Sequence, residues 1–344
     1  MSTAGAPTPS IATYRGRFAP SPTGDLHLGS AATALVAWLS ARAAGGRLVL
    51  RVEDLDPPRV VAGAEARQLD DLRWLGLDWD EGPDVGGPHA PYRQSERAAH
   101  YAAAIAALER RGLVYRCDCS RADVARVASA PHAGEEGPRY PGTCRTRDPG
   151  ATAWKRPPAL RLRVPDETVT VEDALHGPLR ENVWRSAGDF VLRRGDGVFA
   201  YQLAVVVDDL AMGITEVVRG HDLLGSTPRQ VLLARLLGGT PPAVAHVPLV
   251  LSTDGTRLAK RSGMVLVRER RAAGATPAEV VGEIARTLGL PRPAVGPCTP
   301  HDLRAVFDRG PLRGITAVRL GVSAAACAAR RRGGSSHRSG PRSR

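Results

Sequence analysis

A short segment near the N-terminus, residues 17–30 (RFAPSPTGDLHLGS), limits the folds that this sequence can adopt. It contains two prolines and two glycines, and it runs directly into the apolar residues 31–39. This order predicts a strand end, a tight loop and the start of a helix. Gly24 and Gly29 allow the backbone to approach a ligand closely, and the first turn of a helix offers unpaired N–H groups to an anion. The segment therefore predicts a site for a phosphate-bearing ligand.

The next residues continue a parallel α/β unit. Residues 47–52 (RLVLRV) predict a strand. This strand ends at residues 53–58, which are acidic and contain two prolines. Helical periodicity follows in residues 65–75 and 95–111. Because ligands of such folds bind at the carboxyl ends of strands, Glu53 is a candidate binding residue.

A second α/β half follows later in the chain. Residues 199–207 (FAYQLAVVV) are predicted to be a strand that ends at two acids, residues 208–209. A strand over 214–219 and a helix over 227–237 come next, and Pro228 suits the first position of that helix. This repetition indicates that residues 113–181 are inserted within one nucleotide-binding fold.

We therefore expect six parts along the chain. They are a flexible N-terminus (1–14), the first half of the catalytic domain (15–112), an inserted subdomain (113–185), the second half of the catalytic domain (186–250), a basic loop with a helical C-terminal part (251–309) and a disordered basic tail (310–344).

Composition restricts the class of protein. The 344 residues, 43% of them hydrophobic, suffice for a sizeable core and about two domains. No apolar run approaches the roughly eighteen residues of a membrane span, so we expect a cytoplasmic protein without membrane contact. The net charge is +12, and the six arginines of residues 330–344 supply half of it. The remaining charge suggests a polyanionic partner.

Three cysteines in a polar, glycine-rich stretch predict a metal site. Cys117 and Cys119 are separated by one residue, and Cys144 follows about twenty-five positions later. Thiolates are soft ligands for a tetrahedral zinc ion, which would stabilise an insertion that has few core residues. The chemistry leaves the fourth ligand open between His132 and Tyr140.

A basic loop follows a short apolar strand in the C-terminal part. Residues 254–263 (DGTRLAKRSG) carry three cations within five positions, bounded by glycines. Such a loop can close over a phosphate chain and neutralise the charge that develops there.

Taken together, these motifs resemble the catalytic domain of class I aminoacyl-tRNA synthetases, in particular the glutamyl and glutaminyl branch. Residues 27–30 (HLGS) match the first ATP motif of that class, and residues 257–261 (RLAKR) match its second, the mobile lysine loop. Five further segments match the glutamyl branch in order, namely residues 17–21 (RFAPS), 51–56 (RVEDLD), 92–95 (YRQS), 200–204 (AYQLA) and 218–224 (VRGHDLL).

The resemblance implies an α/β protein. Its fold would be the class I Rossmann-type nucleotide-binding fold with an inserted zinc-binding, acceptor-like subdomain and a short helical C-terminal part. Fewer than ninety residues follow Lys260, so we expect no counterpart of the anticodon-binding region of full glutamyl-tRNA synthetases in this sequence. The chain is more similar to a short paralogue that activates glutamate without tRNA and attaches it to queuosine in the anticodon loop of tRNA(Asp). Ser30, where full synthetases commonly have glycine, is usual in that paralogue.

The resemblance also implies roles for individual residues. His27 and Lys260 would be catalytic, and Gly29 and Ser30 would join them in binding ATP with Mg²⁺. One structural zinc ion per chain would be held by Cys117, Cys119, Tyr140 and Cys144. The glutamate pocket would be formed by Arg17, Phe18, Ala19, Pro20, Ser21, Glu53, Tyr201 and Arg219.

Two other functions remain compatible with the sequence. One is a truncated glutamyl-tRNA synthetase that charges tRNA(Glu), and the other is a non-catalytic paralogue that binds zinc and RNA. A monomer is the default expectation for the oligomeric state.

Overall fold

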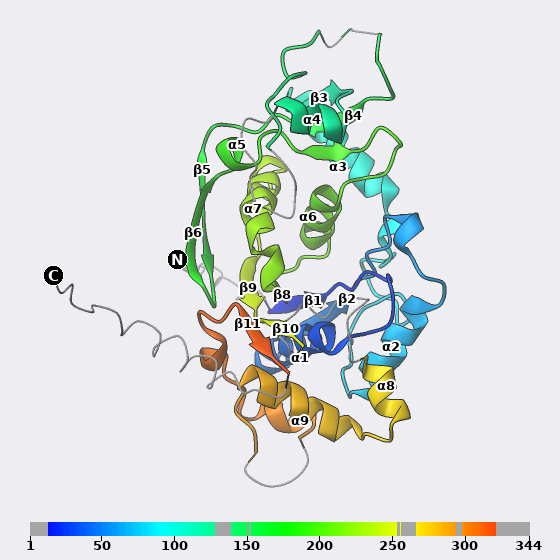
Figure 1. The fold of residues 1–344 in the computed structure, drawn as a ribbon, viewed down its shortest axis with the longest axis vertical. Coiled ribbons are helices and arrows are strands. Elements are labelled where there is room, and N and C mark those ends of the chain that lie inside the picture. The colour runs from blue at the N-terminus through cyan, green and yellow to red at the C-terminus, as the bar shows by residue number, and fades with distance from the viewer. Residues whose placement is uncertain are drawn as a thin grey trace, which may run out of the picture.

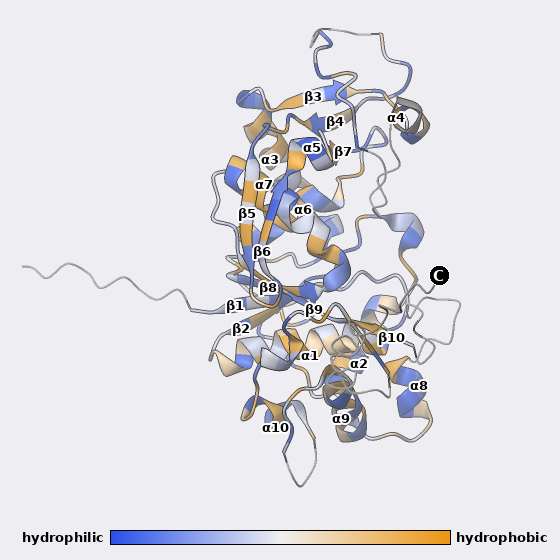
Figure 2. Ribbon diagram, turned by 60° about the vertical axis from the view of Figure 1, so that its left-hand side comes forward, coloured by the Kyte–Doolittle hydropathy of each residue, from blue (hydrophilic) through white to orange (hydrophobic). Residues whose placement is uncertain are grey.

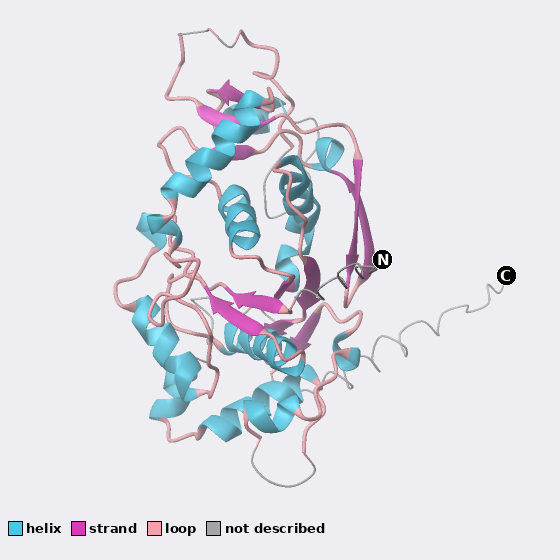
Figure 3. Cartoon of the chain, turned by 180° about the vertical axis from the view of Figure 1, so that it is seen from behind, coloured by secondary structure: helices cyan, strands magenta, loops and turns pink. Residues whose placement is uncertain are grey.

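The computed structural model describes residues 13–127, 139–148, 150, 153–252, 255, 266–293 and 298–320 (Figure 1). A six-stranded sheet lies at its centre. The strand order is β2 (Arg47–Leu50), β1 (Arg15–Phe18), β8 (Glu216–Gly220), β9 (Ala243–Val247), β5 (Thr168–Asp173) and β6 (Gly177–Asn182). The first five strands are parallel, and β6 returns antiparallel to β5. Figure 3 shows helices on both sides of this sheet.

The first helix, α1 (Leu28–Ala43), is buried on nearly all sides. One side contacts β1, β2 and β8, and the other contacts α9 (Pro277–Leu288) and α10 (Pro300–Arg304). A helix that is covered on both sides needs apolar residues around its whole circumference. This explains why residues 31–39 are apolar except for Thr33, and Trp38 among them is fully buried.

A second core lies on the opposite side of the sheet. There α3 (Ala98–Arg110), α6 (Tyr201–Ala211) and α7 (Thr227–Leu236) pack around a cluster that includes Tyr101 and Leu203. The remaining elements of the two halves are α2 (Ala64–Trp74) and the 3₁₀ helices η1 (Pro57–Arg59), η2 (Gln94–Glu96) and η3 (His221–Ser226).

The predicted strand over residues 199–207 is wrong, because this segment enters α6 at Tyr201. A run of apolar residues reads alike in a buried strand and a buried helix. The helix leaves Leu203 to Val207 in the core and also buries Asp208 and Asp209, at 0% and 6% exposure. A strand that ended at these two acids would have exposed them.

The inserted region forms a small antiparallel sheet at the top of Figure 1. Its strands are β3 (Val114–Cys117), β4 (Ala159–Leu162) and β7 (Val191–Arg193), in that order. Two short helices accompany it, α4 (Arg121–Val127) and α5 (Val183–Ser186). The domain boundaries expected from the sequence stay predictions.

The C-terminal part packs below the central sheet. The strand β10 (Leu249–Leu251) pairs in parallel with β11 (Ala317–Arg319), and α8 (Val267–Ala272) lies beside α2. Figure 2 shows α8 mainly hydrophilic, and its Arg268 and Arg271 pair with Asp71 and Asp70 of α2. No helix in the described part of the chain is long and apolar enough to cross a membrane.

The expectation of a disordered tail from residue 310 is wrong for its first residues. Residues 310–320 contain η4 (Gly310–Leu312) and β11, and they bury Leu312, Val318 and Leu320 against the main core. Few apolar residues were enough here, because β10 supplied a ready partner edge. Residues 321–344 lie outside the described residues.

Candidate active site

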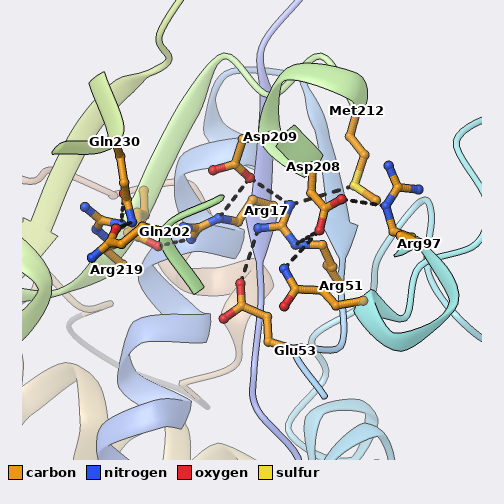
Figure 4. A network of polar contacts seen from close by, with 12 residues as sticks. Arg17, Arg51, Glu53, Arg97, Gln202, Asp208, Asp209, Met212, Arg219 and Gln230 are labelled. Carbon is orange, nitrogen blue, oxygen red and sulfur yellow. Dashed lines mark hydrogen bonds and ion pairs between the residues drawn. The ribbon is translucent and has the colours of Figure 1, made fainter. Parts of the chain in front are cut away.

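Three arginines stand in a row at the carboxyl ends of neighbouring strands. Arg51 follows β2, Arg17 belongs to β1 and Arg219 belongs to β8. Each is at most 4% exposed. Figure 4 shows Arg17 and Arg51 between Glu53 and Asp209, with Arg219 to one side beside Gln202 and Gln230. The parallel sheet thus gathers segments that are far apart in sequence into one strongly charged site.

Glu53 lies at the acidic end of this site. Its Oε1 accepts from Arg51 Nη2 at 3.3 Å, and its own N–H donates to the carbonyl of Pro20 at 3.0 Å. Burial raises the pKa of Glu53, and the positive charges of Arg51 and Arg17 oppose that rise. A ligand cation placed here would likewise favour the ionised carboxylate.

Arg17 contacts both its neighbouring strand and α6. Its Nη1 donates to the carbonyl of Val218 at 3.0 Å, and its Nε lies 3.7 Å from Asp209 Oδ1. Within the described ranges, Arg17 Nε has no hydrogen-bond partner. A buried guanidinium donor without a partner is a favourable place for a ligand carboxylate.

Arg219 is held from several directions. Its Nε donates to His246 Nε2 at 2.9 Å, Nη1 to Gln230 Oε1 at 2.5 Å, and Nη2 to Thr227 Oγ1 at 2.8 Å and the Leu223 carbonyl at 3.3 Å. These contacts use four of its five N–H donors. Burial lowers the pKa of Arg219, while the guanidinium remains charged at neutral pH.

Tyr201 lies at the first turn of α6, where the charges of Glu53, Arg219 and Arg17 act on its hydroxyl. It is 36% exposed, and burial of its hydroxyl together with the nearby Glu53 carboxylate raises its pKa. The neutral phenol can therefore donate a hydrogen bond to a ligand and accept another. The structure brings Arg17, Glu53, Tyr201 and Arg219 together.

The other predicted glutamate residues have different surroundings. The Phe18 side chain is 7% exposed and packs in the main core, so it points away from the charged site. Ala19 and Pro20 are half-buried, and Ser21 is exposed. The carbonyl of Ser21 accepts from Gln68 Nε2 at 3.2 Å. These residues belong to the loop between β1 and α1, and their role in binding glutamate stays a prediction.

His27 caps the N-terminus of α1. Its Nδ1 accepts from the Ser30 N–H at 3.1 Å, and its Nε2 lies 3.0 Å from Ser30 Oγ. Burial lowers the pKa of His27. A Cβ on Gly29 would lie only 3.0 Å from His27 Nδ1, so glycine leaves room for the ring. His27, Gly29 and Ser30 thus form one compact turn.

Lys260 and the rest of residues 256–265 lie outside the described residues. Their two flanks are described and reach the His27 turn. The Val267 N–H donates to the Leu26 carbonyl at 2.9 Å, which pairs Leu266 with His27. Before the loop, Val250 lies next to Gly29. The described segments on both sides of residues 256–265 therefore lie beside the predicted ATP turn.

A buried ion network lies behind the site, and the sequence motifs do not indicate it. Asp208 accepts from Arg97 Nε at 2.6 Å, Gln94 Nε2 at 2.9 Å and the Tyr101 hydroxyl at 2.9 Å, and lies 3.7 Å from Arg51 Nε. Asp209 accepts from Arg51 Nη1 at 2.7 Å. The available signal in the sequence is a pair of acids directly after an apolar run, residues 208–209.

The three cysteine thiols form a separate cluster in the insertion. The sulfur atoms of Cys117, Cys119 and Cys144 all lie within 4.8 Å of one another. Tyr140 Oη lies 3.3 Å from Cys117 Sγ and accepts from the Cys144 N–H at 2.9 Å. Tetrahedral zinc–thiolate geometry places sulfurs about 3.8 Å apart. The three sulfurs are therefore close enough together to hold a metal ion, and the Tyr140 hydroxyl lies beside them. His132 lies outside the described residues.

A pH dependence of stability follows from His246, which is fully buried. Burial lowers its pKa from 6.5 to about 4, and Asp173 only partly opposes this. Between these two values the unfolded chain binds the proton that the folded chain excludes, so stability falls as the pH falls through this window. Urea unfolding of His246→Gln should give a flatter profile there. Burial also lowers the pKa of His27 and His221, so these two residues add a pH dependence of the same sign to both proteins. A profile of His246→Gln as steep as that of the wild type would contradict the prediction.

The fold is that of a class I tRNA synthetase catalytic domain. A family model described as "tRNA synthetases class I (E and Q), catalytic domain" matches residues 13–298. The crystal structure of a glutamate tRNA ligase from Elizabethkingia meningosepticum in complex with its amino acid superposes with a TM-score of 0.77 at 29% identity, covering 90% of this chain and 67% of that one.

Sequence relatives narrow the assignment. The Glutamyl-Q tRNA(Asp) synthetase of Symbiobacterium thermophilum is 54% identical over 299 residues, covering 85% of this chain and 92% of that protein. The chain belongs to this family of class I synthetases. Glutamate–tRNA ligase 2 of Acidithiobacillus ferrooxidans is 47% identical over 277 residues, but only 57% of its length is covered.

Proposed function

We propose that this protein activates L-glutamate with ATP in the absence of tRNA and transfers the glutamyl group to queuosine in the anticodon loop of tRNA(Asp). The observation that carries the first step is the charge arrangement at the strand ends. Arg17 and Arg219 lie in the same buried site as Glu53, and Tyr201 lies near all three. This set matches an amino acid with two carboxylates and one ammonium group.

Each charge has a place in this proposal. The guanidinium groups of Arg17 and Arg219 bind the substrate carboxylates, and Glu53 pairs with the ammonium group. Glutamine would bring a neutral amide to a buried arginine and leave that charge poorly compensated. Rejection of glutamine therefore comes from the cost of an unpaired buried cation.

Activation joins the α-carboxylate oxygen of glutamate to the α-phosphorus of ATP while the bond to pyrophosphate breaks. No side-chain nucleophile is required, so positioning and charge stabilisation supply the catalysis. We propose that His27, Gly29 and Ser30 bind ATP at the start of α1 and that Lys260 binds the departing phosphates. Mg²⁺ bound with ATP would neutralise part of the phosphate charge.

Two observations support the proposed acceptor, namely the names of the relatives and the share of each relative that this chain covers. The chain spans most of the Glutamyl-Q tRNA(Asp) synthetases but little more than half of the full-length glutamate–tRNA ligases. The cytoplasmic location and the monomeric state also stay predictions.

The test uses glutamate-dependent exchange of labelled pyrophosphate into ATP without tRNA, followed by transfer of labelled glutamate. Three acceptors are compared, namely tRNA(Asp) with queuosine, the same tRNA without queuosine, and tRNA(Glu). We expect label on the first alone. Label on tRNA(Glu) would instead support a truncated glutamyl-tRNA synthetase, and absence of exchange would support a non-catalytic paralogue.

We further propose that the metal is one structural zinc ion, held by Cys117, Cys119, Tyr140 and Cys144. Burial, reinforced by Cys117, raises the pKa of the Cys119 thiol to about 12. A bound dication would reverse this by stabilising the thiolate. The ion would also join β3 to the segment around Cys144, across residues 128–138.

Removal of one thiol should therefore release the metal. We expect Cys119→Ser to lose about one zinc per chain and to make the insertion more sensitive to protease, because the binding energy of the ion is also folding energy. Elemental analysis and limited proteolysis measure the two effects. Cys298→Ser is the matched control, since Cys298 lies apart from the cluster beside Gly282. Zinc-free wild-type protein would contradict the proposal.

A further inference from the structure

Three buried polar residues on adjacent strands are connected in a line behind the amino acid site. Arg219 on β8 lies directly opposite His246 on β9 in the parallel register. Asp173 ends β5, the next strand, where it pairs with Val244 of β9. Arg219, His246 and Asp173 are 4%, 0% and 1% exposed. Neighbouring strands thus each contribute one member of a hydrogen-bonded line.

The direction of these hydrogen bonds fixes the histidine tautomer. An arginine Nε–H can only donate, so His246 Nε2, 2.9 Å away, must accept. The imidazole proton of the neutral ring is then on Nδ1, which donates to Asp173 Oδ2 at 2.6 Å. Arg219 and Asp173 therefore require the same tautomer from opposite sides of the ring.

The carboxylate of Asp173 is itself oriented by the backbone. Its Oδ1 accepts from the N–H groups of Leu175 and His176 at 2.9 and 3.0 Å. Only Oδ2 is left to face His246. The turn after β5 consequently determines which oxygen meets the imidazole.

We propose that Asp173 and His246 are positioning residues of the amino acid site, which fix Arg219 Nε by holding His246 in the Nδ1–H tautomer. This inference rests on the proposed role of Arg219 in binding glutamate. With Nε fixed in this way and the two Nη atoms held by Gln230 and Thr227, the guanidinium plane is set before the substrate arrives. Less conformational entropy is then lost on binding, and the carboxylate meets a donor already in place.

Asp173→Asn is the most direct test, because it is nearly isosteric and should invert the tautomer. The backbone N–H groups of Leu175 and His176 keep the amide oxygen at the Oδ1 position. The amide NH₂ must then face His246 Nδ1 as a donor, which moves the imidazole proton to Nε2. Two N–H donors, from His246 Nε2 and Arg219 Nε, would then point at each other. The other neighbour of His246 Nε2 is the Thr227 hydroxyl, 3.2 Å away, which already accepts from Arg219 Nη2, so an Nε2–H that turns to it competes with Arg219 for the same acceptor.

Two measurements follow this change. Long-range ¹H–¹⁵N NMR spectra of the histidine rings distinguish the tautomers without any substrate, and His246→Gln assigns the signal. We expect Nδ1–H in the wild type and Nε2–H in Asp173→Asn. In pyrophosphate exchange, we expect the KM for glutamate to rise about ten- to a hundredfold, as for a lost charge-assisted hydrogen bond, with the KM for ATP nearly unchanged.

A second pair of variants guards against simple loss of folding. His246→Gln keeps an oxygen that can accept from Arg219 Nε, whereas His246→Leu does not, so the first should retain most of the glutamate affinity that the second loses. Asp189→Asn is the matched control. Asp189 is also a fully buried aspartate, but its Oδ2 faces the Tyr115 hydroxyl at 2.7 Å, which can accept from an amide.

Three outcomes would overturn the proposal. They are an Nε2–H tautomer in the wild type, an inverted tautomer with an unchanged KM for glutamate, and equal effects of His246→Gln and His246→Leu. Absence of glutamate-dependent exchange in the wild type would instead contradict the proposed function. In that case the NMR spectra would still decide whether Asp173 sets the tautomer of His246.

Discussion

Arg219→Leu is expected to reduce kcat/KM for glutamate in pyrophosphate exchange about a hundredfold or more, with little change in the KM for ATP. The substitution removes a buried cation that we place against a substrate carboxylate, and the loss of one partner of such a pair is among the largest single-residue effects on binding. Steady-state exchange at varied glutamate and varied ATP separates the two parameters.

Arg309→Leu provides the matched control. Arg309 makes a two-contact ion pair with Glu216, at 2.6 and 2.7 Å, at the opposite end of the same strand β8. Its loss should lower stability but leave the glutamate KM near the wild-type value. Equal kinetic effects of the two substitutions would show that Arg219 acts through the stability of β8, which would contradict its role in binding.

Asp208→Ala should lower the free energy of unfolding more than any of the other substitutions described above. Asp208 is fully buried between Arg51 and Arg97, and it also accepts from Gln94 and Tyr101. Without it, two guanidinium groups remain buried with less compensating charge, at a cost of about 3–5 kcal/mol in the free energy of unfolding. Urea unfolding followed by circular dichroism measures this value.

Asp70→Ala is the corresponding surface variant. Asp70 also pairs with an arginine, Arg271 Nη1 at 2.9 Å, but its side chain is 60% exposed. An exposed pair of this kind contributes at most about 1 kcal/mol. If the two aspartates proved equally costly to remove, burial of the Asp208 network would not be the source of its stabilising effect.

Local signals in the sequence predict part of the site. The glycines and the histidine of residues 24–30 mark a turn before a helix, and Glu53 follows a strand, so the sequence alone places His27 at the start of a helix and Glu53 at the end of a strand. The family resemblance adds Tyr201 and Arg219. The structure brings the four glutamate-pocket side chains together, although their roles stay predictions.

The parts that could not be predicted depend on contacts between distant segments. His246 is a single histidine within the apolar strand β9, and only the strand order β8–β9–β5 places it between Arg219 and Asp173. Asp208 and Asp209 follow an apolar run that fits a strand and a helix equally well. Tertiary packing decides between the two.

The described segments on both sides of residues 256–265 lie at the His27 turn, with Val250 next to Gly29 and Leu266 paired with His27. Lys260, which we propose to bind the departing phosphates, is joined through the chain to both of these segments. A side chain tethered in this way has an effective concentration at the turn that depends on chain length rather than on diffusion from solvent. Because the entropy of closing such a loop grows only logarithmically with its length, moderate insertions there should slow activation gradually rather than abolish it.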